Sequence, residues 1–381
     1  MSERPPYQRA LTVLAALATA ALVASVLAPA SAGPAVAAHL ALALGALPLI
    51  LGAIGVFTPT LTQTGPPPRG LALLPAVGAL AGGLAVYALR GDLRAVALAA
   101  PLGVGAAAGT LAFTATRARA GLGRAHPCLR WYQAALSCSV LALVAIGVAA
   151  FAPARWAPLR RVHLHLNLLG FVGLAAVGTL HVLIPTAGGY PDPDARRRLQ
   201  RGLPFALGGT LGVALGSSAP ALRPLAFAGA AAWGVALGDL ALAVARRGAA
   251  WQRASLPLVA ALGGLALALA FGVGVALGLA PRRSASVVFR VGFLLPLITG
   301  ALAQLLPVWR WPGAAVAPRE RARARLVWGG GVRALAFPAL GVGLGLELAP
   351  GWLRLGVLGL LGVFAAQVVA ALGVRSTPPP A

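Results

Sequence analysis

The sequence predicts an all-α, polytopic membrane protein with about twelve transmembrane helices in three pseudo-repeated four-helix units. Of its 381 residues, 59% are hydrophobic and only 10% are charged, and apolar runs of about 20 residues recur from end to end. A helix of that length crosses the hydrocarbon core of a bilayer. No alternating strand pattern is present, and backbone polar groups in lipid must be paired internally. We therefore expect helices rather than a barrel.

The apolar runs define the expected spans. In chain order they cover residues 10–30, 35–61, 70–89, 93–116, 131–152, 162–186, 203–219, 221–245, 256–280, 285–308, 331–348 and 352–374. The first run follows Arg4 and Arg9 and precedes Ala30-Ser31-Ala32, as in a secretory signal, but it is long for one. We expect it to be retained as the first helix. The seventh run is short and rich in glycine and serine, and longer loops are expected around 117–130, 187–202 and 309–330.

The charge distribution predicts how the chain is oriented in the membrane. A net charge of +24 would suggest nucleic acid as the partner of a soluble protein, but here the arginines lie in short loops between apolar runs. The expected partner is the lipid bilayer, and no nucleic-acid partner is expected. With the N-terminus inside, 21 arginines fall on the cytoplasmic side and nine on the other, with Arg290 left within a span. This bias favours a multi-pass protein of the inner (cytoplasmic) membrane with both termini in the cytoplasm.

One segment recurs at the second helix of each group of four. The aligned positions are His39, Gly52 and Pro59, then His165, Gly178 and Pro185, then Val287, Gly300 and Pro307. The spacing is identical in the three copies. We therefore expect residues 1–381 to form a single integral membrane domain with repeat units at approximately 10–116, 131–245 and 256–374.

The histidines of these helices are the candidate ligands. The second, sixth and tenth helices run in the same direction, which places His39, His163 and His165 at one depth near the outer surface. Neutral imidazole binds both haem iron and copper. Residues two apart on a helix point about 200° apart, so His163 and His165 face different pockets. Two imidazoles from different helices, such as His39 and His165, could ligate a low-spin haem. The alternative is that each histidine is a hydrogen-bonding group between helices.

Three further polar residues lie inside expected spans. Arg290 could pair with a haem propionate or another anion, or could extend its charged end to the outer interface. His181 lies nearer the cytoplasmic end and suits a structural role or a polar path. Asp239 is the one carboxylate well inside a span, which makes it a candidate for a proton path.

These features together resemble the haem-copper oxidase subunit I superfamily. The segment from His163 to Leu174 is similar to the histidine helices of its divergent members, which include NnrS-like proteins and the membrane modules fused to copper nitrite reductases. The third copy, Gly300-Ala-Leu-Ala-Gln304-Leu-Leu-Pro307-Val308, is similar to the same modules. The resemblance implies haem b and/or copper as cofactor, with His39 and either His165 or His163 as haem ligands.

The chain departs from that family at the copper site. The histidine-rich motif is on the sixth helix rather than the tenth, the seventh helix has no adjacent histidine pair, and no tyrosine lies near His163 or His165. We therefore expect no oxygen-reducing copper site. The first hypothesis is electron transfer, metal or haem handling, or a role related to nitric oxide, with a possible redox partner protein. The second is a cofactor-free permease or structural membrane protein that uses the histidines and Asp239 as a polar path. Whether the protein is an enzyme stays open.

Overall fold

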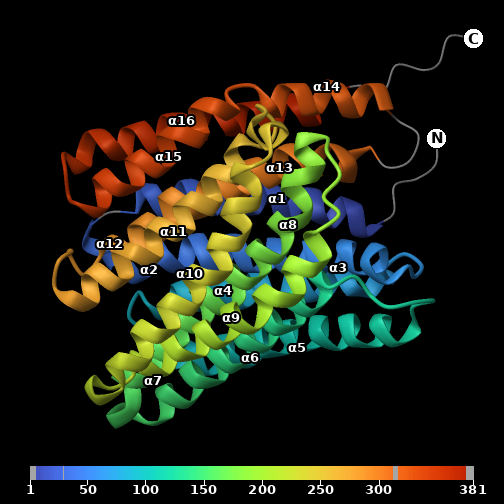
Figure 1. Cartoon of the computed structure of the whole chain (residues 1–381). Coiled ribbons are helices and arrows are strands. Elements are labelled where there is room, and N and C mark those ends of the chain that lie inside the picture. The colour runs from blue at the N-terminus through green and yellow to red at the C-terminus, as the bar shows by residue number, and fades with distance from the viewer. Residues whose placement is uncertain (1–5, 29, 312–315, 375–381) are drawn as a thin grey trace, which may run out of the picture. The chain divides into compact units, whose positions relative to one another are not determined.

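The computed structural model describes residues 6–28, 30–311 and 316–374, and it confirms the predicted all-α membrane fold in these ranges. Every regular element there is a helix (Figure 1). Eleven of the described helices are long and apolar enough to cross a membrane. The chain is therefore a multi-pass membrane protein, as its composition predicts.

Short connections join the helices. Their bounds are α1 (Pro6–Leu27), α2 (Gly33–His39), α3 (Leu47–Thr62), α4 (Leu73–Ala88), α5 (Val96–Ala120), α6 (Cys128–Phe151), α7 (Trp156–His165), α8 (Leu174–Gly188), α9 (Ala195–Gly216), α10 (Arg223–Ala245), α11 (Leu256–Leu277), α12 (Ser284–Val287), α13 (Leu295–Arg310), α14 (Val316–Val327), α15 (Gly330–Gly345) and α16 (Pro350–Leu372). Three more segments have π-helical geometry: η2 (Leu40–Ala46), η6 (Leu166–Gly173) and η9 (Val288–Leu294).

Two regions differ in detail from the sequence-based expectation. The seventh expected span lies within α9, which begins earlier, at Ala195, and is not among the eleven candidate spans. Four arginines in its first two turns lower its mean hydropathy. The expected loop at 309–330 contains α14, whose residues Pro318, Ala322 and Leu326 form a buried stripe at helical spacing. Its many arginines conceal that stripe from a search for apolar runs.

The three π segments occupy the same place in the aligned copies. They begin directly after His39, His165 and Val287, the three positions that the sequence alignment makes equivalent. π turns are rare and occur mostly at functional sites. Pro48 and Pro296 explain two of them, because a proline cannot donate the hydrogen bond that would continue an α-helix. The recurrence gives the repeated segments a common backbone feature, and the threefold division of the whole chain stays a prediction.

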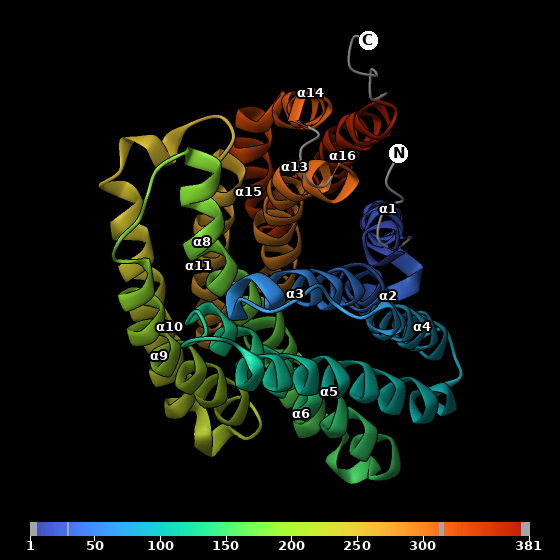
Figure 2. The same ribbon diagram turned by 90° about the vertical axis from the view of Figure 1, so that its right-hand side faces the viewer.

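Packing divides the chain into two compact units. Unit 1 comprises residues 1–19, 183–191 and 244–381, and unit 2 comprises 20–182 and 192–243. In unit 2, α6 packs against α5, α7 and η6, and Figure 2 shows α5 and α6 side by side. The buried indoles of Trp131 on α6 and Trp233 on α10 both bond to α9, because Trp131 donates to the oxygen of Leu199 and Trp233 donates to the hydroxyl of Thr210.

Unit 1 is organised around its own π segment. η9 packs between α11 and α15, where Gly264 and Gly341 face the main chain of Gly292. A Cβ at Gly264 would overlap the carbonyl of Gly292. Small residues therefore allow the close backbone approach that is typical of membrane helix packing.

Candidate cofactor site

Two of the predicted ligands lie side by side in unit 2. His39 is the last residue of α2, and His163 lies on α7. Their ring centroids are 6.3 Å apart, and their planes are nearly parallel, at 11°. Both side chains are half-buried. The structure thus brings together two imidazoles from helices that are far apart in sequence.

Hydrogen bonds determine which nitrogen of each ring is free. Nδ1 of His39 lies 2.8 Å from the oxygen of Ala35, and Nδ1 of His163 lies 2.9 Å from the oxygen of Ala142 on α6. A carbonyl only accepts, so each Nδ1 must carry the proton. In a neutral ring Nε2 then keeps its lone pair. This is the tautomer that metal-binding histidines use, with the other nitrogen oriented by an acceptor.

Asn167 supports His163 from one turn further along the helix. Its amide nitrogen donates to the main-chain oxygen of His163 at 3.0 Å and also lies 3.3 Å from Nδ1 of that ring. Because Nδ1 donates to Ala142, the bond to the carbonyl is the one that Asn167 makes. The side chain therefore takes an acceptor that the α-helix would otherwise use. This competition gives a local reason for the π turn η6 where no proline is present.

His165 does not take part in the pair. It is half-buried on α7, and no hydrogen bond to its side chain is found in the described residues. By the repeat alignment His165 is the equivalent of His39, whereas the equivalents of His163 are Ala37 and Ala285. The partner of His39 is thus His163, a histidine that only the second copy carries at this position. The example pairing of His39 with His165 that the sequence suggested is not the pairing that the structure shows.

The site is a pair rather than a cluster. Within the described ranges, no group of three or more histidine, cysteine, aspartate or glutamate side chains is placed to hold a metal ion. A haem needs fewer protein ligands, because the porphyrin supplies four nitrogens and the protein only the axial positions. Two imidazoles with free Nε2 atoms therefore suit a haem better than a bare ion.

Arg290 lies in unit 1, within η9. It is half-buried, and its Nε donates to the oxygen of Ser286 at 3.3 Å. That bond to its own helix ties down one edge of the guanidinium. The expected pairing of Arg290 with a propionate or another anion stays a prediction.

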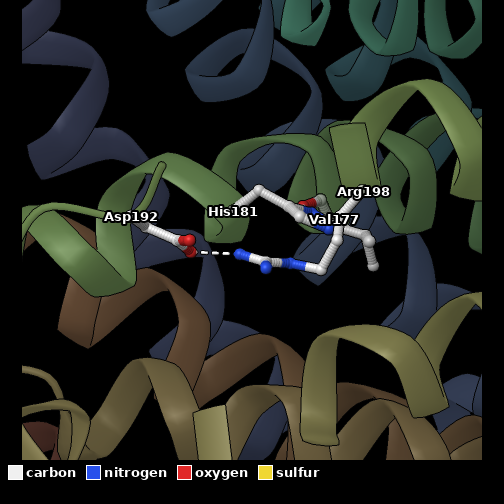
Figure 3. A network of polar contacts seen from close by, with 4 residues as sticks. All are labelled: Val177, His181, Asp192 and Arg198. Carbon is white, nitrogen blue, oxygen red and sulfur yellow. Dashed lines mark hydrogen bonds and ion pairs between the residues drawn. The ribbon is translucent and has the colours of Figure 1, made fainter. Parts of the chain in front are cut away.

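His181 is in a second polar group of unit 2. It is buried, its Nδ1 lies 2.8 Å from the oxygen of Val177, and its ring lies 5.9 Å from that of Trp131. Figure 3 shows the Arg198 side chain extending past His181 toward Asp192, with which it forms an ion pair.

Asp239 is exposed on α10. The expected carboxylate in a span is therefore present on the surface of its helix rather than inside the packed core of unit 2. Sequence reasoning did not connect Arg198 with Asp192. The available signal was the placement of Asp192 just before a helix whose first turns carry several arginines, because opposite charges so close in sequence can pair.

No protein-family model matches the chain, and no curated protein shows significant similarity to it. The resemblance to divergent members of the haem-copper oxidase superfamily therefore rests on the residues quoted above and on the arrangement of the spans.

Proposed function

We propose that this multi-pass membrane protein binds haem b and that His39 and His163 would hold the group. The supporting observation is the pair of near-parallel imidazoles from α2 and α7, each with Nδ1 tied to a carbonyl. With 6.3 Å between their ring centroids, the two imidazoles are close enough to contact one group. Plain aromatic pairing occurs at similar distances, so the free nitrogens carry the argument rather than the separation.

The chemistry follows from the ligand set. A haem held by two imidazoles would supply electron transfer. His39 and His163 hold and orient the group, while the carbonyls of Ala35 and Ala142 keep each ring neutral and fixed. Electron transfer, haem or metal handling, or a role related to nitric oxide fits this set better than oxygen reduction.

The distribution of arginines suggests on which side of the membrane this activity occurs. The arginine bias supports an orientation with both termini in the cytoplasm and the histidine pair in the outer half of the inner membrane. A redox partner protein would then meet the site from the outer side. His165 on the same helix faces a different direction and is a candidate for a second centre rather than for this one.

Copper is the second candidate for the same pair. Neutral imidazole suits copper as well as haem iron, but two protein ligands leave a copper ion with few donors. Counting metal on the purified protein separates the two. A purified protein that contains copper but no haem would keep His39 and His163 as the binding site, with copper in place of haem iron.

The second candidate function is a cofactor-free permease. The observation that favours it is the buried His181, past which the Arg198 side chain extends to its ion pair with Asp192. Titratable and charged groups gathered at the end of a span are candidates for an ion or proton path.

The spectrum of the full-length protein, expressed with haem supplied, tests the first proposal. One haem per chain with sharp bands after dithionite reduction supports it. A colourless, metal-free protein contradicts it and leaves the permease.

A further inference from the structure

Exposed arginines gather in unit 2 where α7 begins. Arg155 lies in the turn just before α7, and Arg160 and Arg161 lie in its first two turns. The α9–α10 connection is beside them, because Arg161 donates through Nη1 to the main-chain oxygen of Ser217 at 3.3 Å, and Figure 1 shows the two segments together at the lower left. Arg223, the first residue of α10, is exposed at the same end. These four arginines are called the α7 surface below.

No carboxylate offsets the α7 surface in the neighbouring sequence. The chain has no aspartate or glutamate from residue 93 to 191, nor from 195 to 238. Within the described ranges, none of the four arginines takes part in an ion pair. The surface therefore carries uncompensated positive charge.

Two of the four guanidinium groups are available to a partner. Arg161 is bonded to the α9–α10 connection, and Arg223 lies over the ring of Phe227, 5.8 Å from its centroid. In the part of the chain that the structure describes, no hydrogen bond is found for the side chain of Arg155 or Arg160. These two residues are therefore the ones whose substitution tests what the surface binds.

Helix length places the α7 surface outside the lipid. The candidate span that contains α7 runs continuously from Pro153 to Gly188. After Arg161 it has no arginine, aspartate or glutamate, and the 27 residues from 162 to 188 are about 40 Å long in helical geometry. That length crosses the roughly 30 Å hydrocarbon core without the first turns of α7. The charged start of α7 therefore extends into water, and His163 follows directly after it.

We propose that the α7 surface docks a water-soluble, acidic electron-transfer protein. The proposal rests on the haem-binding function proposed above, because a partner at this surface meets the helix that carries His163. Arg160 precedes His163 by three residues, or about 4.5 Å of helix rise. Complementary charge orients and speeds such encounters, and complexes between redox proteins are small and transient. A phospholipid is the less suitable occupant, because the arginines precede the segment that crosses the bilayer.

The test measures the binding of a purified flavodoxin, an acidic electron carrier, to the full-length protein in a neutral detergent. A basic cytochrome c is the probe of opposite charge. We expect flavodoxin to bind and cytochrome c not to bind, and we expect the flavodoxin affinity to fall steeply between about 20 and about 200 mM salt. In the double variant Arg155→Gln with Arg160→Gln, the affinity is about 5- to 10-fold lower and depends less on salt.

The matched control is Arg90→Gln with Arg94→Gln. These two arginines are exposed around the α4–α5 connection, which the alternating direction of the helices places at the same end of unit 2. The control removes the same charge and leaves the flavodoxin affinity unchanged. An equal loss in both double variants overturns the proposal in favour of a general charge effect, as does equal binding of the two probes. If the α7 double variant does not fold, Arg160→Gln alone must still lower the affinity about 2- to 3-fold.

Two further readouts separate the remaining alternatives. Phosphatidylglycerol that displaces flavodoxin at about one molecule per chain, where phosphatidylcholine does not, shows a lipid surface and overturns the choice of a protein partner. Haem is counted on the same samples. Flavodoxin binding that needs Arg155 and Arg160 in a protein without haem supports the docking surface and contradicts the haem function. A haem-loaded protein that does not bind flavodoxin contradicts the docking surface alone.

Discussion

Nδ1 of His163 on α7 lies 2.9 Å from the main-chain oxygen of Ala142 on α6. This contact decides the chemistry of the ring, because it places the proton on Nδ1 and leaves Nε2 free. It also joins the candidate ligand to α6, which packs against α5, α7 and η6. The helix α6 therefore orients the His163 ring through this hydrogen bond.

The first prediction concerns Asn167. Replacing it with leucine removes the amide that donates to the main-chain oxygen of His163. That oxygen is then available to the main-chain N–H that would continue an α-helix. We expect the π turn to relax and haem affinity to fall about 10- to 100-fold, as for other changes in groups that orient metal-binding histidines. Haem titration of the apoprotein measures this. Leu168→Ala on the same segment is the control, and an unchanged affinity in Asn167→Leu would show that Asn167 does not position His163.

Adjacent glycines on α11 make a paired prediction. A Cβ at Gly264 overlaps the carbonyl of Gly292, whereas a Cβ at Gly263 meets nothing within 4 Å. We expect Gly264→Ala to lower the free energy of unfolding by about 1–3 kcal/mol through overpacking. Gly263→Ala is neutral or slightly stabilising, because alanine is the better helix former. Thermal unfolding in detergent measures both, and equal behaviour of the two variants contradicts the packing of η9.

The same comparison is available in unit 2. On α4, a Cβ at Gly82 overlaps the main chain of Ala43 in η2, and Gly83 beside it has open space. Gly82→Ala should therefore destabilise the protein and disturb the segment that follows His39, while Gly83→Ala should do neither. If Gly82→Ala loses haem while Gly83→Ala retains it, haem binding depends on the backbone of η2.

Arg333 is expected to be important for stability. Replacing it with methionine removes the donor to the buried carbonyl of Leu326 and one of the two donors to the carbonyl of Trp328, which keeps its bond from Gln367. We expect a loss of about 2–4 kcal/mol, the usual range for several buried hydrogen bonds to a charged group. Arg354→Met, on the exposed face of α16, is the control and should change stability by less than about 0.5 kcal/mol. Similar losses in both variants would contradict the role of Arg333.

A pH effect is expected at His126, in the loop between α5 and α6. Burial of the ring, and then the positive charge of Arg196, lower the pKa of His126 below its ordinary value. The unfolded chain then binds this proton more tightly than the folded protein does. The stability contributed by the neutral ring is therefore complete above about pH 6.5 and is lost as the pH falls below that value.

His126→Asn tests this directly. Asparagine keeps an acceptor for the main-chain N–H of Cys128, which the ring accepts at 3.3 Å, but it does not titrate. We expect the fall in Tm between about pH 7 and pH 5 to be smaller in the variant. Identical slopes for the two proteins would show that His126 does not contribute.

Much of the fold follows from the sequence. Apolar length and arginine placement locate most of the helices, since a membrane span is a simple consequence of hydropathy. α14 was missed because its buried stripe of Pro318, Ala322 and Leu326 is made of three residues among arginines. Such a short apolar stripe stabilises a helix only where neighbouring helices, here α13 and α16, cover it.

The site was predicted in part. The histidines were recognised by type and position, but helical spacing alone did not show whether His163 or His165 faces His39. That choice depends on how α7 is rotated against α6, and on the π turn, which the side chain of Asn167 helps to form. A π turn changes the register of every later residue, and no periodicity rule anticipates it.

The pairing of His39 with His163 is tested by the reduced visible spectra of His163→Ala and His165→Ala, recorded beside the wild type on equal amounts of folded protein. We expect the haem bands of the wild type to be lost in His163→Ala, as in His39→Ala, and kept in His165→Ala. Loss of the bands in His165→Ala with their retention in His163→Ala would contradict the assignment of the pair.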